Sequence, residues 1–154
     1  MDDFKDFASY LTDDEISKVA PMIERIKALD SRKIKQESFM SFVKYVWPQF
    51  IEGGHHKIYA QKLQDVADGK CKRLIINMPP RHTKSEFASY LFPTWLMGRR
   101  PDLKIIQATH TAELAVGFGR KIKNLIESED FKDVFPDVSL ASDAKASGRW
   151  STNG

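Results

Sequence analysis

The sequence predicts an α/β fold, in which a parallel β-sheet with crossover helices follows an α-helical N-terminal lead. The first observation is that two short runs, residues 73–78 and 103–109, are dense in aliphatic side chains, as buried strands are. The second is that a stretch with helical spacing of apolar residues follows each run. This alternation of strand and helix favours a parallel sheet with right-handed connections.

Before the first aliphatic run the sequence predicts only helices. Thr12 and Glu15 form a capping box that begins a helix, and Pro21 is expected to kink it because proline lacks an N–H donor. The polar residues 32–37 are expected to link this helix to the next one, which Pro48 stops. The helices predicted in this part of the chain cover residues 4–11, 12–30, 38–47 and 56–68.

Beyond residue 70 the predicted elements alternate. A glycine and a Pro-Pro pair bound the first aliphatic run, and a Pro-Asp turn precedes the second. The helix after the first run contains Pro93 and is closed by Gly98, and Thr111 is placed to cap the helix after the second run. The predicted elements are strand 73–78, helix 84–97, strand 103–109 and helix 112–128.

Composition excludes several classes of protein. The chain of 154 residues has a net charge of +3 and a single cysteine, so an intrachain disulfide framework is excluded. No apolar stretch approaches the roughly 20 residues that a membrane-spanning helix needs, so no membrane association is expected. Residues 70–123 hold eleven Lys and Arg against three acids. This basic middle favours a polyanionic partner such as nucleotide phosphate or nucleic acid, although a solvated charged face is an equally simple explanation.

The connection between the first predicted strand and its helix carries the chemistry. Lys84 and Ser85 open the helix, where backbone N–H groups present partial positive charge, a lysine can reach the β- and γ-phosphates, and a serine hydroxyl can ligate Mg²⁺. The standard pattern G-x-x-x-x-G-K-[ST] fails at both glycines, where Met78 and Thr83 stand. From these residues alone, a phosphate site and a loop with a merely solvated lysine both stay open.

Thr83 is the sharper departure, because glycine lets the backbone approach phosphate and tolerates a positive φ, whereas a β-branched residue does neither well. Either the loop adopts a conformation that threonine accepts, or nucleotide binding is impaired. Replacement of Thr83 by glycine is expected to tighten ATP binding.

The run of residues 74–86, LIINMPPRHTKSE, resembles the deviant Walker A segment of tailed-phage terminase large subunits, the motors that package viral DNA. The similarity extends from about His55 to Trp150, and the combination Pro-Pro-Arg-His-x-Lys-Ser-Glu makes it specific. It implies a P-loop NTPase-type parallel sheet, incomplete in this chain. The implied domains are a helical lead over residues 1–52 and the N-terminal part of an ATPase domain over residues 53–154.

The resemblance also implies site residues, with ATP and Mg²⁺ as cofactors. Lys84 and Arg81 would be catalytic, the arginine acting on the γ-phosphate, and Ser85 would be the magnesium ligand. A segment ahead of the first strand would contact adenine, which points to His56, Tyr59 and Gln61. The residues implied in nucleotide binding by the loop itself are Pro80, Arg81, His82, Thr83, Lys84, Ser85 and Glu86.

The implied partners are double-stranded DNA, the portal protein and the terminase small subunit, with a homo-oligomeric ring as the full-length assembly and the host cytoplasm as the location. The segment of Gly148, Arg149 and Trp150 precedes the Walker B strand in this family, so the chain is expected to be a fragment that lacks Walker B and the nuclease domain. Two other functions stay open. One is a helicase-like or other nucleic-acid remodelling ATPase, and the other is a non-enzymatic basic nucleic-acid-binding module.

Overall fold

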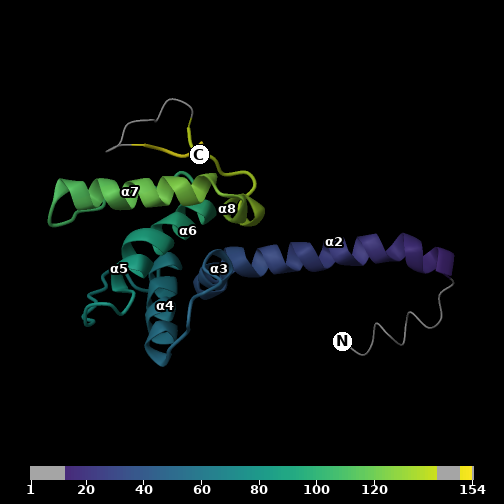
Figure 1. Ribbon diagram of the computed structural model, residues 1–154, viewed down its shortest axis with the longest axis horizontal. Helices are drawn as coiled ribbons and strands as arrows, with labels where there is room; N and C mark the ends of the chain where they lie inside the picture. Colours follow the sequence, from purple (N-terminus) through teal and green to yellow (C-terminus); the bar gives the residue numbers. More distant parts are fainter. Residues whose placement is uncertain (1–12, 142–149, 154) are drawn as a thin grey trace. The chain divides into compact units, whose positions relative to one another are not determined.

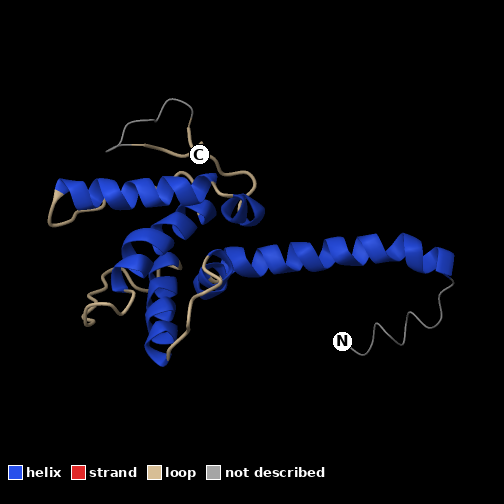
Figure 2. Ribbon diagram, in the orientation of Figure 1, coloured by secondary structure: helices blue, strands red, loops and turns tan. Residues whose placement is uncertain are grey.

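The computed structural model describes the backbone of residues 13–141 and 150–153, and these residues form helices joined by loops (Figures 1 and 2). The chain divides into two compact units, Met1–Lys33 and Ile34–Gly154. The regular elements are α2 (Asp13–Glu37), α3 (Phe39–Val46), α4 (Gly54–Ala67), α5 (Lys84–Glu86), the π-helical η1 (Phe87–Leu91), α6 (Phe92–Arg99), α7 (Ala112–Glu127) and α8 (Glu129–Val134).

The predicted sheet is wrong, because no residue in the described part of the chain belongs to a β-strand. Residues 73–78 and 103–109 lie in loops, and the pairing nearest to a sheet is an isolated antiparallel bridge between Leu140 and Thr152. A strand needs a second strand about 4.8 Å away that accepts its N–H groups. Among the described residues, no backbone carbonyl accepts from the N–H groups of residues 72–77. The P-loop NTPase-type parallel sheet is therefore absent from these residues.

The aliphatic run 73–78 is half-buried instead. Leu74, Ile76 and Met78 pack against the helical core, while Ile75 between them is 88% exposed. The apolar composition of this run thus reflects one face that contacts helices, and it does not reflect burial inside a sheet.

Helix α2 differs from its prediction at its C-terminal end. It continues to Glu37 through the polar residues 32–37, which were expected to form a link, and it contains Pro21. The physical reason is that Arg, Lys, Gln and Glu are good helix formers, so polarity alone does not end a helix. The predicted helix over residues 4–11 lies outside the described residues.

The helices predicted for α3, α4 and α7 are confirmed with shifts of a few residues at their ends. Ser38 caps α3, since its side chain accepts a hydrogen bond from the backbone N–H of Ser41 at 3.3 Å. Thr111 caps α7 in the same way through Leu114. The short helix α8 was not predicted, although Ser128 caps it by the same chemistry.

The predicted helix 84–97 is an unbroken helical run from Lys84 to Arg99, in which the middle turn is π-helical. Pro93 lacks an N–H, so it cannot donate the usual α-helical bond to the carbonyl of Ser89, four residues earlier. The side-chain amide of Gln107 donates to this carbonyl at 3.2 Å. The second aliphatic segment is thereby attached to the helix at the point that the proline weakens.

The core of the Ile34–Gly154 unit is built on aromatic side chains. Phe39 of α3 packs edge-to-face on Phe87 and Phe92, with ring centroids 5.6 and 5.5 Å apart, and also contacts Trp95. The indole N–H of Trp95 donates to the carbonyl of Lys35 at 3.1 Å, so even this fully buried side chain has its polar atom satisfied. Burial of these rings orients the helix that carries the candidate site.

Candidate functional site

The loop before α5 has an unusual backbone. Arg81 and Thr83 are the two non-glycine residues with positive φ in the described chain, at 62° and 58°. Thr83 has ψ of 9° and occupies the left-handed region that a glycine would adopt without steric cost. Threonine therefore adopts, under strain, a backbone conformation that glycine would adopt freely.

The helix that follows begins with unsatisfied backbone donors. Its first helical bond runs from the N–H of Phe87 to the carbonyl of Thr83 at 2.9 Å. Within the described chain, no side chain caps this end, because the hydroxyl of Thr83 donates to the carbonyl of His82. The N–H groups at such a helix start carry partial positive charge and bind anions.

Lys84 lies at the first position of this helix and folds back over the loop. Its Nζ donates to the carbonyl of Met78 at 3.4 Å, and the side chain remains exposed. Ser85 and Arg81 are exposed as well. An ammonium group, a guanidinium group, a hydroxyl and the free helix start thus belong to one short exposed segment, which suits the binding of phosphate oxygens.

Tyr59 of α4 fixes the beginning of the helix. Its hydroxyl donates to the backbone carbonyl of Lys84 at 2.8 Å, and its ring stacks on Phe87 with centroids 5.4 Å apart. Tyr59 is 4% exposed, and burial raises the pKa of its hydroxyl to about 12. The residue therefore lies beside the loop and supports it, but its ring is not accessible for stacking on adenine.

Three histidines gather on the same side of the loop. The ring of His82 lies 5.6 Å from that of His55, which lies 3.8 Å from the ring of His56. His82 is held by a 2.8 Å hydrogen bond between Nδ1 and the carbonyl of Pro80. His55 was not among the predicted site residues, and its position directly before His56 gave no signal that it would contact the loop.

His56 is buried and in a neutral form. Its Nδ1 accepts a hydrogen bond from the backbone N–H of Gly53 at 2.9 Å, while its buried Nε2 has no partner among the described residues. Burial lowers the pKa of His56, and the neighbouring His55 and His82 lower it further, against an opposing contribution from Glu52. His56 therefore belongs to the core at the start of α4, and it is not an exposed adenine contact.

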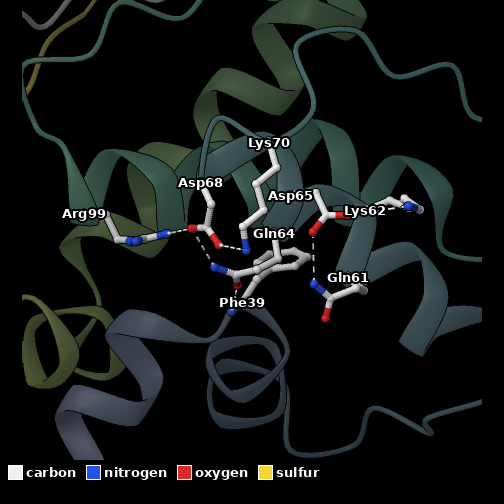
Figure 3. A network of polar contacts seen from close by, with 8 residues as sticks. All are labelled: Phe39, Gln61, Lys62, Gln64, Asp65, Asp68, Lys70 and Arg99. Atoms are coloured by element: carbon white, nitrogen blue, oxygen red, sulfur yellow. Dashed lines mark hydrogen bonds and ion pairs between the residues drawn. The ribbon is translucent and has the colours of Figure 1, made fainter.

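Gln61 lies on a different face of α4. Its side-chain amide donates to Asp65 at 3.1 Å, as Figure 3 shows. It also lines a cavity of about 470 Å³ between the beginning of α3 and α4. The other residues that line this cavity are Glu37, Ser38, Met40, Glu52, Lys57, Ala60 and Gln64. The three predicted adenine contacts thus do not come together at one site.

The polar network in Figure 3 ties the end of α4 to the end of α6. Asp68 accepts hydrogen bonds from Arg99 at 3.2 Å and from Gln64 at 3.1 Å, and it pairs with Lys70. Burial raises the pKa of Asp68, but the hydrogen bonds from Arg99 and Gln64 and the charges of Arg99 and Lys70 outweigh this effect and bring it below its ordinary value. The carboxylate stays ionised and braces the helix pair.

Glu86 is engaged by a residue that the sequence did not indicate. Its carboxylate forms a 3.0 Å ion pair with Lys121 of α7, and the ammonium group also lies 5.6 Å from the ring of Tyr90. Because 35 residues separate Lys121 from Glu86, no local pattern could have found it. Glu86 therefore connects the loop to α7 and is not placed as a free ligand.

A magnesium site would have few protein ligands here. The structure describes no group of three or more His, Cys, Asp or Glu residues that could hold a metal ion. The exposed hydroxyl of Ser85 fits the single protein ligand that Mg²⁺ often takes when phosphates and water complete its coordination. Ser85 can therefore help to bind Mg²⁺ only if the phosphates of the nucleotide and water supply the other ligands of the ion.

Comparison of the chain with protein-family models, with curated proteins and with solved structures gives no match. Among the helices in the described part of the chain, none is both long and apolar enough to cross a membrane.

Proposed function

We propose that the loop of residues 78–86 binds the phosphates of ATP, and that the chain is the ATP-binding portion of a viral DNA-packaging terminase large subunit. Such a protein would couple ATP hydrolysis to the translocation of double-stranded DNA into a procapsid in the host cytoplasm. The observation that carries the proposal is the uncapped helix start at Lys84, which follows a left-handed residue and lies in the run LIINMPPRHTKSE.

The roles of the loop residues follow from their chemistry. The helix start and Lys84 would hold the phosphate oxygens, and Ser85 would ligate the magnesium ion that accompanies the nucleotide. The ion would neutralise charge on the phosphates. Arg81 has an exposed guanidinium group on the same loop, which is suited to two parallel hydrogen bonds with a phosphate. The buried side chains of His56 and Tyr59 would support the loop from the core side.

ATP can bind at this loop without adenine contacts from His56, Tyr59 and Gln61. Since Tyr59 is buried and Gln61 lies on another face of α4, most of the affinity would come from phosphate contacts. Inorganic triphosphate is therefore expected to compete with ATP for the loop almost as well as a nucleoside triphosphate with a different base does.

The test is nucleotide binding by the 154-residue chain, measured by calorimetry with Mg-ATP. The Lys84→Ala variant is expected to bind at least about tenfold more weakly, because it loses a charge-assisted contact of roughly 1.5–3 kcal/mol. Lys104→Ala is a matched control, since Lys104 is also an exposed lysine but lies outside the loop. Equal affinities for the wild type and Lys84→Ala would leave the non-enzymatic basic module as the better description.

A second test distinguishes a terminase from a helicase-like ATPase. Terminase large subunits carry a metal-dependent nuclease after the ATPase domain. The reading frame beyond residue 154 in the source genome is expected to encode such an acidic domain. A frame that instead encodes further helicase motifs would contradict the packaging role and leave the phosphate site unaffected.

A further inference from the structure

Helix α2 carries a stripe of exposed apolar side chains in a coiled-coil spacing. Met22, Ile26 and Leu29 are 64%, 56% and 50% exposed, and Val19 is partly exposed. These four residues follow one another at intervals of three, four and three positions, which is the a–d pattern of a heptad repeat. Solvent exposure of three large aliphatic side chains along one helix face indicates a surface that contacts another molecule.

The residue types at the a and d positions indicate how many helices associate in the coiled coil. Val19 and Ile26 fall at a positions and are β-branched, while Met22 and Leu29 fall at d positions and are not. β-Branched residues at a combined with leucine at d favour two-stranded parallel coils.

Charge complementarity points to a second copy of the same chain. In this register Arg25 falls at a g position and Asp30 at the e position of the next heptad. In a parallel dimer the g residue of one helix faces that e residue of the other, so Arg25 would face Asp30 of the second copy twice by symmetry. In an antiparallel pair, arginine would face arginine and aspartate would face aspartate. The pattern therefore favours the parallel arrangement.

We propose that α2 forms a parallel, in-register two-stranded coiled coil with α2 of a second copy of this chain. The stripe from Val19 to Leu29 covers about three turns, or roughly 16 Å. This is short, and the buried area is below that of stable dimers, so a dissociation constant on the order of 100 µM is expected. The inference is independent of the phosphate loop.

The test is sedimentation equilibrium of the 154-residue chain between about 10 µM and 1 mM. The wild type is expected to dimerise over this range, and Ile26→Asp is expected to stay monomeric. Ala28→Asp is the matched control, because Ala28 lies at a c position of the same exposed helix and should leave the dimer intact. A wild type that remains monomeric, or a dimer that survives Ile26→Asp, would overturn the proposal.

Charge reversal tests the orientation. Arg25→Asp and Asp30→Arg each place like charges across both symmetric pairs, so each is expected to weaken self-association about tenfold. An equimolar mixture of the two variants restores opposite charges and should dimerise as the wild type does. Self-association that neither single variant weakens would overturn the parallel register. Co-sedimentation with lipid vesicles tests the other occupant. If the wild type is monomeric but binds vesicles, and Ile26→Asp does not bind them, the stripe contacts a lipid surface and the dimer proposal is wrong.

Discussion

The hydroxyl of Tyr59 donates a hydrogen bond to the backbone carbonyl of Lys84 at 2.8 Å, and this bond joins α4 to the first residue of the helix after the loop. The ring that carries the hydroxyl is stacked on Phe87 one turn later. A buried side chain of α4 therefore fixes both the direction of the helix start and the position of the lysine backbone. The candidate phosphate site depends on a contact between residues 25 positions apart.

Tyr59→Phe is expected to destabilise the fold by about 1 kcal/mol, since it removes one buried hydrogen bond and keeps the ring. It is also expected to weaken Mg-ATP binding severalfold, because the helix start is then less firmly held. Urea unfolding and calorimetry measure the two effects. Tyr90→Phe is the control, since Tyr90 is half-buried and its hydroxyl has no hydrogen-bond partner among the described residues. Equal effects of the two variants would contradict a positioning role for Tyr59.

Thr83→Gly is expected to stabilise the protein by roughly 0.5–1 kcal/mol, because relief of the left-handed strain exceeds the entropy cost of glycine. Tighter Mg-ATP binding is expected with it, since the backbone can approach phosphate more closely. Thr111→Gly provides the comparison. Thr111 has φ of −132° and caps α7, so glycine there should destabilise. Unchanged or weaker nucleotide affinity of Thr83→Gly in calorimetry would show that the strain does not limit binding.

Gly98→Ala tests the close approach of α6 to the residue after α8. A Cβ at position 98 would lie 2.4 Å from the ring of Phe135, which is itself packed against Phe131 and Phe42. The expected cost is about 1–3 kcal/mol in urea unfolding, because the ring cannot move freely. Gly117→Ala is a matched control within α7, where no atom lies within 4 Å of the new methyl group, and it should stabilise by about 0.5–1 kcal/mol. If Gly98→Ala left the free energy of unfolding unchanged, Phe135 would have room to shift, and the close approach would not limit stability.

The buried His56 predicts a loss of stability at mildly acidic pH. Its pKa in the folded protein lies below the ordinary value of 6.5, so the unfolded chain binds its proton more readily than the folded protein does. The folding free energy contributed by the neutral ring is complete above pH 6.5. It declines as the pH falls below that value and stops changing below the folded pKa.

The variant His56→Asn isolates this effect, because its side-chain oxygen can still accept from the N–H of Gly53 while the residue does not titrate. Urea unfolding at pH 7.5 and pH 5 is the measurement. The wild type should lose more stability between these values than His56→Asn does. Identical losses in the two proteins would show that His56 titrates normally in the fold.

Local patterns were sufficient for much of the helical structure. Ser38 and Thr111 begin helices because their side chains accept from backbone N–H groups within the same turn, an interaction that only neighbouring residues decide. The loop was located by the same kind of information, since Lys84 follows an aliphatic run and begins a helix. The polar composition of residues 32–37 predicts a link, but α2 continues through them to Glu37, because polarity does not by itself end a helix.

The sheet could not be decided locally, because an aliphatic run such as residues 73–78 becomes a strand only if another segment accepts its backbone hydrogen bonds. In the described residues it contacts helices instead, with Leu74 and Ile76 inward and Ile75 in solvent. Likewise, periodicity placed His56, Tyr59 and Gln61 on one helix, but only packing decided that His56 and Tyr59 are buried while Gln61 lines a cavity.

The sequence by itself determined, to within two residues, where α3, α4, α7 and the helical run from Lys84 begin. It also determined which segment carries the lysine, serine and arginine of the loop. Hydrogen bonds and apolar periodicity within a few residues contain that information. The tertiary structure alone decided that Thr83 adopts a left-handed backbone, that Lys121 engages Glu86, and that Tyr59 holds the helix start. These outcomes depend on contacts between residues far apart in the chain, whose energies no local pattern records.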